Sequence, residues 1–599
     1  MNFNSKLILL TCLLAILPFY LISQNNPLVI GAGQLSGVTV TSSSSTNASS
    51  DENTLSDNGF LPNLTATSRF LGQATLGANY ETIVAVADKG EENWLDEQME
   101  LPISFTIEDL VKDYTLWAAD SIFTRGGDVT RIEPQLRYWH FAWWQYVMTT
   151  QDLLRSRVAL ALSEIFVISE LPQLRNTPLA LANYYDMLMR NTFGNFRQLI
   201  EDVTFHPAMG VYLTHMNNPK ADPTINRFPD ENYAREIMQL FTIGLFELNP
   251  DGSQKLDGNG IPIPTYGDEE IQEFAKVFTG LTWGDNFVFG RNPTREESYT
   301  QPMQMFNFWH EPGEKQLLNN VVIPNRNPVD GLADISDGLD NLVNHPNVGP
   351  FIGRLLIQRL VKSNPSPDYI SRVTAVFNDN GQGVRGDMKA VIKAILLDPE
   401  ARNCPNPDDA FGGMLREPMV RYTHAARAFN AASEEGTYRN RMDDFYNLTF
   451  QRPLGAPSVF NFFVPYYQPI GSIEENNLVA PEFQITNSVS IMGYGNELHD
   501  WVMRDYDVMQ YSSIYNGEQS NNSKRVNLDL SHEIQLGEEG KIDELVERLD
   551  LVLCHGQMTS KTKGLIKKAI TDIPENRANL RGRTAIFLTM ISPDYLILR

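Results

Sequence analysis

The stretch NYYDMLMRNTFGNFRQLIEDVTFHPAMGVYL, residues 183–213, decides the fold class. Apolar side chains recur every three to four residues over 179–189 and again over 196–203, which is the period of an amphipathic helix. The run NTFGN between these segments and the pair His206-Pro207 after them interrupt the pattern. We therefore expect two helices joined by a short turn.

The same period continues in both directions and predicts a mainly α fold, a large multi-helix globular module. We expect further helices over residues 67–89 with a break at Gly77, 91–99, 135–148, 152–169, 230–244, 268–279, 349–361, 367–377, 388–397, 417–429, 542–553, 559–570 and 577–591. Long loops rich in Gly, Pro and Asn are expected over 249–266, 282–328 and 437–481. The turns NPDG and LDGNG in the first of these loops predict a small β-hairpin insertion.

Two segments of the chain echo each other. AVIKAILLDPEAR, from Ala390, and TAIFLTMISPDYLILR, from Thr584, are both apolar helices that end in a residue followed by Pro and an acid. Proline stops a helix and can also begin the next one. The echo predicts a duplicated helix–turn unit and no solenoid.

The first residues indicate export. Lys6 precedes the apolar run from Leu7 to Ile22, which contains Pro18 and is shorter than the roughly 20 residues that span a bilayer. We expect residues 1–23 to be a signal peptide and residues 24–63 to be a flexible linker rich in Ser, Thr, Asn and Gly. Residues 64–599 then form the folded module, in the periplasm, at the cell surface or outside the cell. We expect no membrane span once the signal is removed.

The chain is acidic. It carries 48 Lys and Arg against 73 Asp and Glu, a formal net charge of −25. A nucleic-acid partner is excluded because phosphate binding relies on Lys and Arg that displace counterions. Docking on an anionic membrane surface is disfavoured for the same reason.

Two cysteines remain after the predicted leader, Cys404 and Cys554. A disulfide between them would close one large loop in an oxidising compartment. Two buried free thiols are the alternative, since free cysteine is commonly buried.

Ten stretches, in order from Arg69 to the C-terminus, resemble the bacterial secreted family called domain of unknown function 1800. They are RFLGQATLG with NWLDEQM, RVALALSEIFVIS, residues 183–213, DENYAREIMQLFTIGLFEL, YGDEEIQEFAKVFTGLTW, FWHEPGEKQLL, LVNHPNVGPFIGRLLIQRLV, AILLDPEAR, PLGAPSVFNFFVPYYQP and LTMISPDYLILR. The resemblance implies a largely helical exported module and supplies no reaction. Its members are often encoded beside a sulfatase-like exported family, domain of unknown function 1501, which implies a partner of that kind.

One departure from the family concerns metals. Some members carry Trp-His-Asn-His-Phe where this chain has residues 162–166, LSEIF, so a site built on those imidazoles has no ligands here. The chain also contains no H-E-x-x-H motif and no close pair of His or Cys at ligand spacing. We expect no metal site and no cofactor.

Polar residues on two predicted helices form the first candidate site. Asn232, Arg235, Glu236 and Gln239 recur at helical spacing and form one stripe. We assign Glu236 a catalytic role and the other three residues a substrate-binding role.

Arg157 and Glu164 align in the same way on the helix predicted over 152–169. Glu164 is assigned a catalytic role and Arg157 a substrate-binding role. If the two stripes face each other, a carboxylate held among Arg and amide groups can act as a general base or an anion clamp. The alternative is a structural role, in which these polar side chains are all paired with one another and fix how the helices pack.

His310, beside Glu311 in NFWHEPGEK, is the remaining catalytic candidate, because His titrates near neutral pH and can act as an acid or base. A structural role is the alternative.

Aromatic residues form two clusters. Trp139, Trp143 and Tyr146 recur at helical spacing, which favours a place in the core. A second cluster, FNFFVPYYQP from Phe460, contains PYYQP, bounded by two prolines and expected to reach the surface. Exposed aromatic rings would suit the sugar rings of an envelope polymer.

Two functional hypotheses follow. The first is an accessory or interaction protein of the bacterial cell envelope that works with a sulfatase-like exported partner or an exopolymer. The second is a secreted hydrolase or lyase acting on a glycan or other polymer through Glu, Arg and Asn residues. An enzyme should line a concave pocket with the two polar stripes, whereas an accessory protein should bury and pair them or leave them flat and exposed.

Overall fold

The computed structural model of the protein describes residues 62–124, 133–170, 173–293, 296–403, 412–439, 442–505 and 525–599. The predicted signal peptide, nearly all of the predicted linker and Cys404 lie outside the described residues. Cys554 is a buried free thiol.

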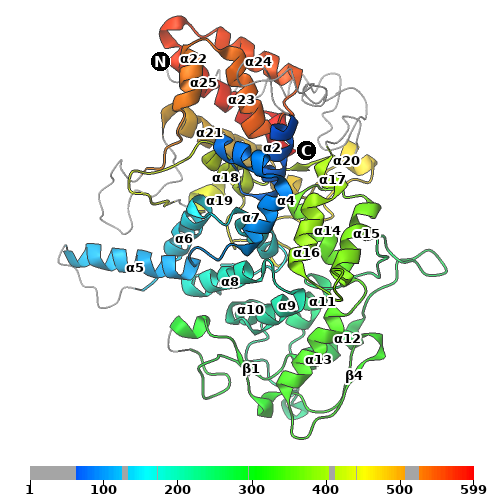
Figure 1. Ribbon diagram of the computed structural model, residues 1–599. Coiled ribbons are helices and arrows are strands. Elements are labelled where there is room, and N and C mark those ends of the chain that lie inside the picture. Colours follow the sequence, from blue (N-terminus) through cyan, green and yellow to red (C-terminus); the bar gives the residue numbers. More distant parts are fainter. Residues whose placement is uncertain are drawn as a thin grey trace.

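Helices dominate the described chain and confirm the mainly α prediction (Figure 1). The N-terminal half contains α2 (Pro62–Ala74), α3 (Tyr80–Lys89), α4 (Glu91–Glu100), α5 (Ile107–Thr124), α6 (Leu136–Thr149), α7 (Leu153–Ser163), α8 (Pro178–Asn191), α9 (Phe196–Phe205), α10 (Pro207–Tyr212), η2 (Pro223–Ile225), α11 (Asn232–Gln239) and α12 (Asp268–Val277). No helix among the described residues is both long enough and apolar enough to cross a bilayer.

Small sheets and short 3₁₀ turns follow α12, and helices then return. These elements are β1 (Leu281–Thr282), η3 (Glu296–Tyr299), β2 (Gln304–Met305), η4 (Asn307–Trp309), β3 (Lys315–Gln316), η5 (Leu318–Asn320), β4 (Val322–Ile323), α13 (Gly331–Val343), α14 (Val348–Leu360), α15 (Pro367–Asn378), α16 (Met388–Leu397), α17 (Pro399–Arg402), β5 (Met414–Leu415) and α18 (Pro418–Ala428). The C-terminal part contains α19 (Met442–Thr449), α20 (Ser472–Glu475), η6 (Pro481–Ile485), α21 (Ser488–Arg504), α22 (Ser531–Glu538), α23 (Ile542–Cys554), α24 (Ser560–Thr571), η8 (Glu575–Arg577), α25 (Asn579–Met590), α26 (Pro593–Leu596) and β6 (Ile597–Leu598).

The arrangement has two ends. Helices α22 to α25 pack together at the top of Figure 1, and α9 to α13 with β1 and β4 lie at the bottom. The three described sheets are antiparallel pairs: β1 with β2, β3 with β4, and β5 with β6. The last pair joins the C-terminus to the segment before α18.

Local chemistry explains the stretch 183–213. The side chain of Asn195 accepts a hydrogen bond from the backbone N–H of Arg197 (2.9 Å) and so begins α9. His206 caps α10 through Nδ1, which accepts from the N–H of Ala208 (3.1 Å), and Pro207 occupies the first helical position. The turn role expected for His206-Pro207 is therefore observed.

Three large aromatic side chains of α6 are fully buried, Trp139, Trp143 and Trp144. The core placement predicted for this cluster is confirmed. Tyr466 in PYYQP is 66% exposed while Phe463, in the same cluster, is buried, so this segment reaches the surface as expected.

The hairpin insertion is present between α11 and α12. The N–H of Glu247 donates to the carbonyl of Ile263 (2.8 Å), and the N–H of Ile263 donates to the carbonyl of Lys255 (3.0 Å). The two echoing segments also share one local structure. Asp398 caps the short helix α17 after α16, and Ser592 caps α26 after α25.

Two predicted helices are shorter than expected. The helix α7 ends at Ser163 instead of residue 169, because the following residues pair with a distant segment: the N–H of Glu170 donates to the carbonyl of Leu454 (2.8 Å). The helix α11 ends at Gln239, and the chain turns at Gly244, whose φ of 72° suits glycine.

The helix α5 was not predicted, and its start is set from elsewhere in the chain. The carboxylate of Asp186 on α8 accepts hydrogen bonds from the N–H groups of Ile107 (2.8 Å) and Glu108 (2.9 Å). Burial raises the pKa of Asp186 to about 7 although these two bonds lower it. A local cap is also present, because the hydroxyl of Thr106 accepts from the N–H of Asp109 (3.1 Å).

Candidate functional site

Six buried polar side chains meet in the core, and we call them the central charged cluster. They are Arg157 on α7, Glu164 just after it, Arg359 on α14, Glu417 before α18, Gln451 after α19 and Glu482 on η6. Five separate parts of the chain therefore supply one site. Of the predicted site residues, the structure brings Arg157 and Glu164 together here.

Gln451 organises two of the carboxylates. Its side-chain oxygen accepts from the N–H of Met419 (3.0 Å), which turns the amide nitrogen toward the acids. That nitrogen donates to Oε1 of Glu164 (3.2 Å) and to Oε2 of Glu417 (2.5 Å). One amide thus bridges two carboxylates.

The two guanidinium groups pair loosely. Nε of Arg359 lies 3.4 Å from Oε2 of Glu164, and Nη1 of Arg157 lies 3.9 Å from Oε1 of Glu417. Nη2 of Arg157 donates to the backbone carbonyl of Arg359. The Arg359 guanidinium also lies over the ring of Phe463, 4.4 Å from its centre.

Burial dominates the protonation of the acids. It raises the pKa of Glu164 well above its ordinary value, and the neighbouring Glu417 raises it further against the opposing effect of Arg359. Burial also raises the pKa of Glu482 to about 8. Glu482 is therefore mostly a neutral acid near pH 7, a state in which it can donate a proton or a hydrogen bond.

Pairing within the cluster is incomplete. Among the described residues, no protein group has hydrogen-bonding geometry with Nε and Nη1 of Arg157, Oε2 of Glu164 or Oε2 of Glu482. Buried polar atoms are seldom left in this condition, because each unmade bond costs about 1–3 kcal/mol. The cluster is thus buried, as a packing network would be, but not fully paired.

The stripe on α11 forms a separate environment. Glu236 is buried and its pKa is raised by burial, with Arg235 opposing that effect. Burial, and to a smaller extent the charge of Glu236, raises the pKa of Tyr212 and the pKa of Tyr266 to about 12 each. The carboxylate therefore lies near these two tyrosines.

The other members of the stripe reach the surface. Arg235 and Gln239 are half-buried, Arg235 donating to Glu231 (3.4 Å), and Asn232 is exposed. The two carboxylates have different neighbours: Arg359, Glu417 and Gln451 surround Glu164, whereas Oε2 of Glu236 has no hydrogen-bond partner among the described residues. We describe the two stripes as two sites, in place of the single layer expected if they faced each other.

His310 is fully buried in a third environment. Its Nδ1 lies 2.9 Å from the carbonyl of Thr279, and its Nε2 lies 3.0 Å from Oδ2 of Asp334. Lys315 donates to the same Oδ2 (2.6 Å), and Arg326 binds the other oxygen. Burial would raise the pKa of Asp334, but the bonds from His310 and Lys315 lower it to about 2.

Sequence reasoning missed four members of the central cluster and a second buried network. In that network Glu170 contacts Nε2 of His140 (2.9 Å) and Nη2 of Arg452 (2.7 Å). One sequence feature could have pointed to the cluster: Arg359 is a charged residue inside the apolar stretch RLLIQRLV. Among the described residues, no three His, Cys, Asp or Glu side chains are grouped to hold a metal ion.

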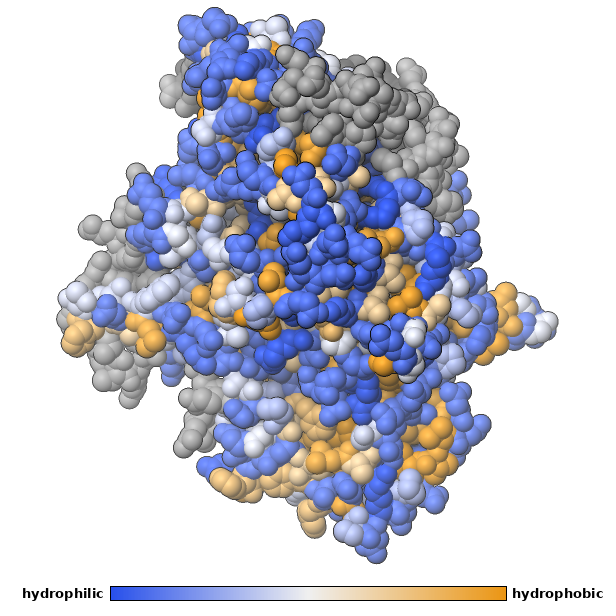
Figure 2. Space-filling view, viewed as in Figure 1, coloured by the Kyte–Doolittle hydropathy of each residue, from blue (hydrophilic) through white to orange (hydrophobic). Residues whose placement is uncertain are grey.

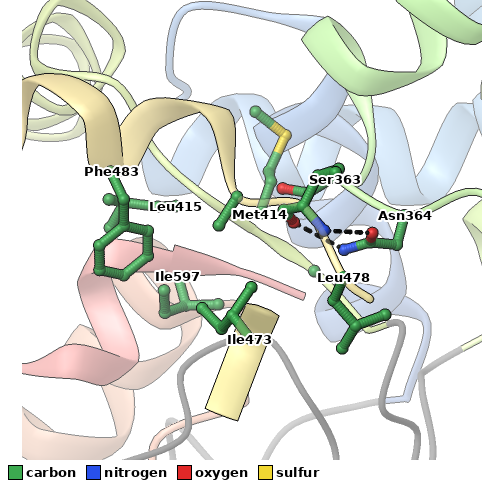
Figure 3. A pocket seen from close by; sticks show the side chains of 11 residues that line it. Ser363, Asn364, Met414, Leu415, Ile473, Leu478, Phe483 and Ile597 are labelled. Atoms are coloured by element: carbon green, nitrogen blue, oxygen red, sulfur yellow. Dashed lines mark hydrogen bonds between the residues drawn. The ribbon is translucent and has the colours of Figure 1, made fainter. Parts of the chain in front are cut away.

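Two pockets are lined by none of the candidate residues predicted from the sequence, although the first lies beside η6, which carries Glu482. One is lined by Ser363, Met414, Ile473 and Phe483 among others (Figure 3), and its free space of about 10 Å³ holds about one water molecule. The other, of about 100 Å³, lies beside Asn79, Arg427 and Asn430. Neither pocket is lined by Glu164, Glu236 or His310.

Comparison with known proteins gives one match. The family model described as "Protein of unknown function (DUF1800)" matches residues 69–597. No curated protein and no solved structure matches the chain.

Proposed function

The chain belongs to this family of proteins of unknown function, DUF1800, and from that premise we propose that it is an exported accessory or interaction protein of the bacterial cell envelope. It acts by binding an exopolymer or a sulfatase-like exported partner. One observation carries the proposal: Arg157 and Glu164 are buried in the core, 1% and 4% exposed, where a polymer does not reach them.

The wider geometry supports the same function. The central charged cluster ties α7, α14 and the start of α18 together through Gln451 and the two guanidinium groups. Such a network fixes how helices pack. The two pockets described above hold little more than a few water molecules, and neither is lined by Arg157 or Glu164.

Affinity capture from native envelopes tests this function. The purified mature chain should retain the same partner or polymer in repeated captures, and assays with envelope polymers should show no turnover. Metal analysis of the same preparation checks for a bound ion. Failure to recover any partner, together with turnover of an envelope polymer, contradicts the proposal.

Export is tested separately. Residues 1–63 are fused to a reporter that is active only outside the cytoplasm. Activity of this fusion, and its loss when residues 7–22 are deleted, is the expected result. A fusion that stays in the cytoplasm contradicts export.

A second function has a specific observation in its favour. The raised pKa of Glu164 and the unpaired atoms of Arg157 and Glu482 are features of sites that move protons. Under this alternative the chain is a hydrolase or lyase on a glycan, and Glu164 acts as the general acid. Substitution Glu164→Gln should then abolish turnover without changing the unfolding transition, and Glu236→Gln tests the α11 site in the same way.

A further inference from the structure

Three loops around β1 and β2 expose large apolar side chains. Phe228 is 66% exposed, Phe287 is 98% exposed and Phe308 is 73% exposed. Figure 2 shows apolar side chains gathered at the lower end of the molecule, the part that carries β1, α13 and β4 in Figure 1. Monomeric proteins seldom expose large apolar groups side by side unless the surface binds something.

Ring contacts join these loops into one surface. The ring of Trp309 stacks on Phe289 with 4.9 Å between centres and meets Phe308 edge-on at 5.4 Å. Phe287 lies two residues before Phe289 on the same loop. We call Phe228, Phe287, Phe289, Phe308 and Trp309 the aromatic surface.

The loop that carries Phe228 is fixed against these rings. The N–H of Lys220 donates to the carbonyl of Trp309 (2.8 Å), and the Arg227 guanidinium lies 5.9 Å from the centre of the Trp309 ring. The N–H of Ala221 donates to Oε2 of Glu311 (2.7 Å). Trp309 and Phe308 are held by these contacts, so they lose little conformational entropy when a ligand binds them.

Charged groups around the surface divide into two kinds. Carboxylates are engaged locally: Asp222 with the N–H of Thr224 (3.1 Å), and Asp285 with the hydroxyl of Ser298 (2.7 Å). Lys220 instead lies over the ring of Phe308, 4.6 Å from its centre, and forms no ion pair within the described parts of the chain. Its N–H groups remain available to a hydroxyl of a ligand.

The charge of the whole chain limits what can dock here. At −25 the chain repels an anionic polymer, an anionic membrane and a second copy of itself. An uncharged ligand with apolar C–H faces is not repelled. A pyranose ring has this chemistry, because its polarised C–H bonds meet the negative face of an aromatic ring and its hydroxyls accept from Lys and Arg.

We propose that the aromatic surface binds an uncharged polysaccharide, whose sugar rings stack on Phe308 and Phe287 with Lys220 bonding to a hydroxyl at the rim. This inference rests on the proposed function and specifies the class of polymer that the chain binds. It requires no part of the central charged cluster.

Affinity gel electrophoresis tests the site. The mature chain is run in native gels that contain a neutral polymer (hydroxyethylcellulose, dextran or xylan), in a gel that contains the anionic polymer polygalacturonate, and in a gel without polymer. At least one of these neutral polymers should slow the chain. The double substitution F287S/F308S should restore the polymer-free mobility, and K220Q should reduce the retardation, because it removes the ammonium group that bonds to the sugar hydroxyl.

A matched control is Tyr466→Ser, which removes an exposed aromatic ring from another part of the chain and should leave the retardation unchanged. Circular dichroism confirms that each variant is folded. Three results overturn the site: no retardation in any neutral gel, full retardation of F287S/F308S, or retardation confined to polygalacturonate.

The experiments distinguish a wrong binding site from a wrong proposed function. A photo-cross-linking amino acid at position 308 that captures a protein in place of a polysaccharide overturns the polysaccharide site. If the wild-type chain and F287S/F308S capture the same envelope partner, the function stands and the site is wrong. If neither captures anything and no polymer slows the chain, both are wrong.

Discussion

The central charged cluster and the aromatic surface reverse the usual distribution of residues. The cluster places Arg157, Glu164 and Glu482 in the core, whereas the surface leaves Phe287 and Phe308 in water. Burying charge and exposing rings both cost free energy. The two regions differ in what they can contact. The buried cluster contacts only the helices of this chain, whereas the exposed rings can contact another molecule. Folding and binding should therefore respond to different substitutions.

The largest expected effect comes from breaking the cluster. Arg157→Met removes the cation beside Glu417 and the donor to the carbonyl of Arg359, and should lower the free energy of unfolding by about 3–5 kcal/mol. Urea unfolding followed by circular dichroism measures the change. Arg235→Met is the control, because its half-exposed pair with Glu231 should contribute under about 0.5 kcal/mol. Equal effects of the two substitutions would contradict the structural role of the cluster.

Glu482 should give the cluster a distinctive pH dependence. Its pKa is raised from 4.5 to about 8, so its protonated form contributes stability that is complete below pH 4.5 and lost as the pH rises through about 8. Glu482→Gln cannot ionise, and its stability relative to wild type should rise by about 4 kcal/mol between pH 5 and pH 9. Unfolding curves at both pH values give this difference. A constant difference would show that Glu482 is charged in the folded protein.

The stability contributed by the network around His310 should depend on pH in the opposite direction. The pKa of Asp334 falls from 3.8 to about 2, so its contribution is present above pH 3.8 and lost as the pH falls toward 2. Asp334→Asn should cost about 2 kcal/mol at pH 7 and about half of that at pH 3. Asp337→Asn, a partly exposed neighbour that also binds Arg326, is the control. A destabilisation by Asp334→Asn that grows toward low pH would contradict the lowered pKa of Asp334.

The smallest effect on folding should come from the aromatic surface. Phe287→Ser and Phe308→Ser remove side chains that are mostly in water, so each should change the free energy of unfolding by less than about 0.5 kcal/mol. Thermal unfolding of the two variants beside wild type checks this. A large loss would mean that these rings belong to the fold.

The sequence predicted most helices because their apolar period and their caps are local, as Asn195 and Pro207 show. It also placed Arg157 and Glu164 on one face of one helix, and both enter the cluster. It could not supply Arg359, Glu417 or Glu482, because pairings across hundreds of residues leave no periodic signal. The early end of α7 was missed for the same reason, since it depends on a distant segment. The start of α5 combines a distant carboxylate, Asp186, with a local cap, Thr106, so a signal for it was present in the sequence.

The most direct test compares Glu164→Gln with F287S/F308S in the neutral-polymer gels, at a temperature where circular dichroism shows all chains folded. The account predicts that Glu164→Gln unfolds at a different urea concentration from wild type yet is slowed by the polymer to the same extent. F287S/F308S should unfold as wild type does and migrate freely. A Glu164→Gln chain that unfolds like wild type but no longer cleaves a polymer that wild type cleaves would contradict the account and establish an enzyme.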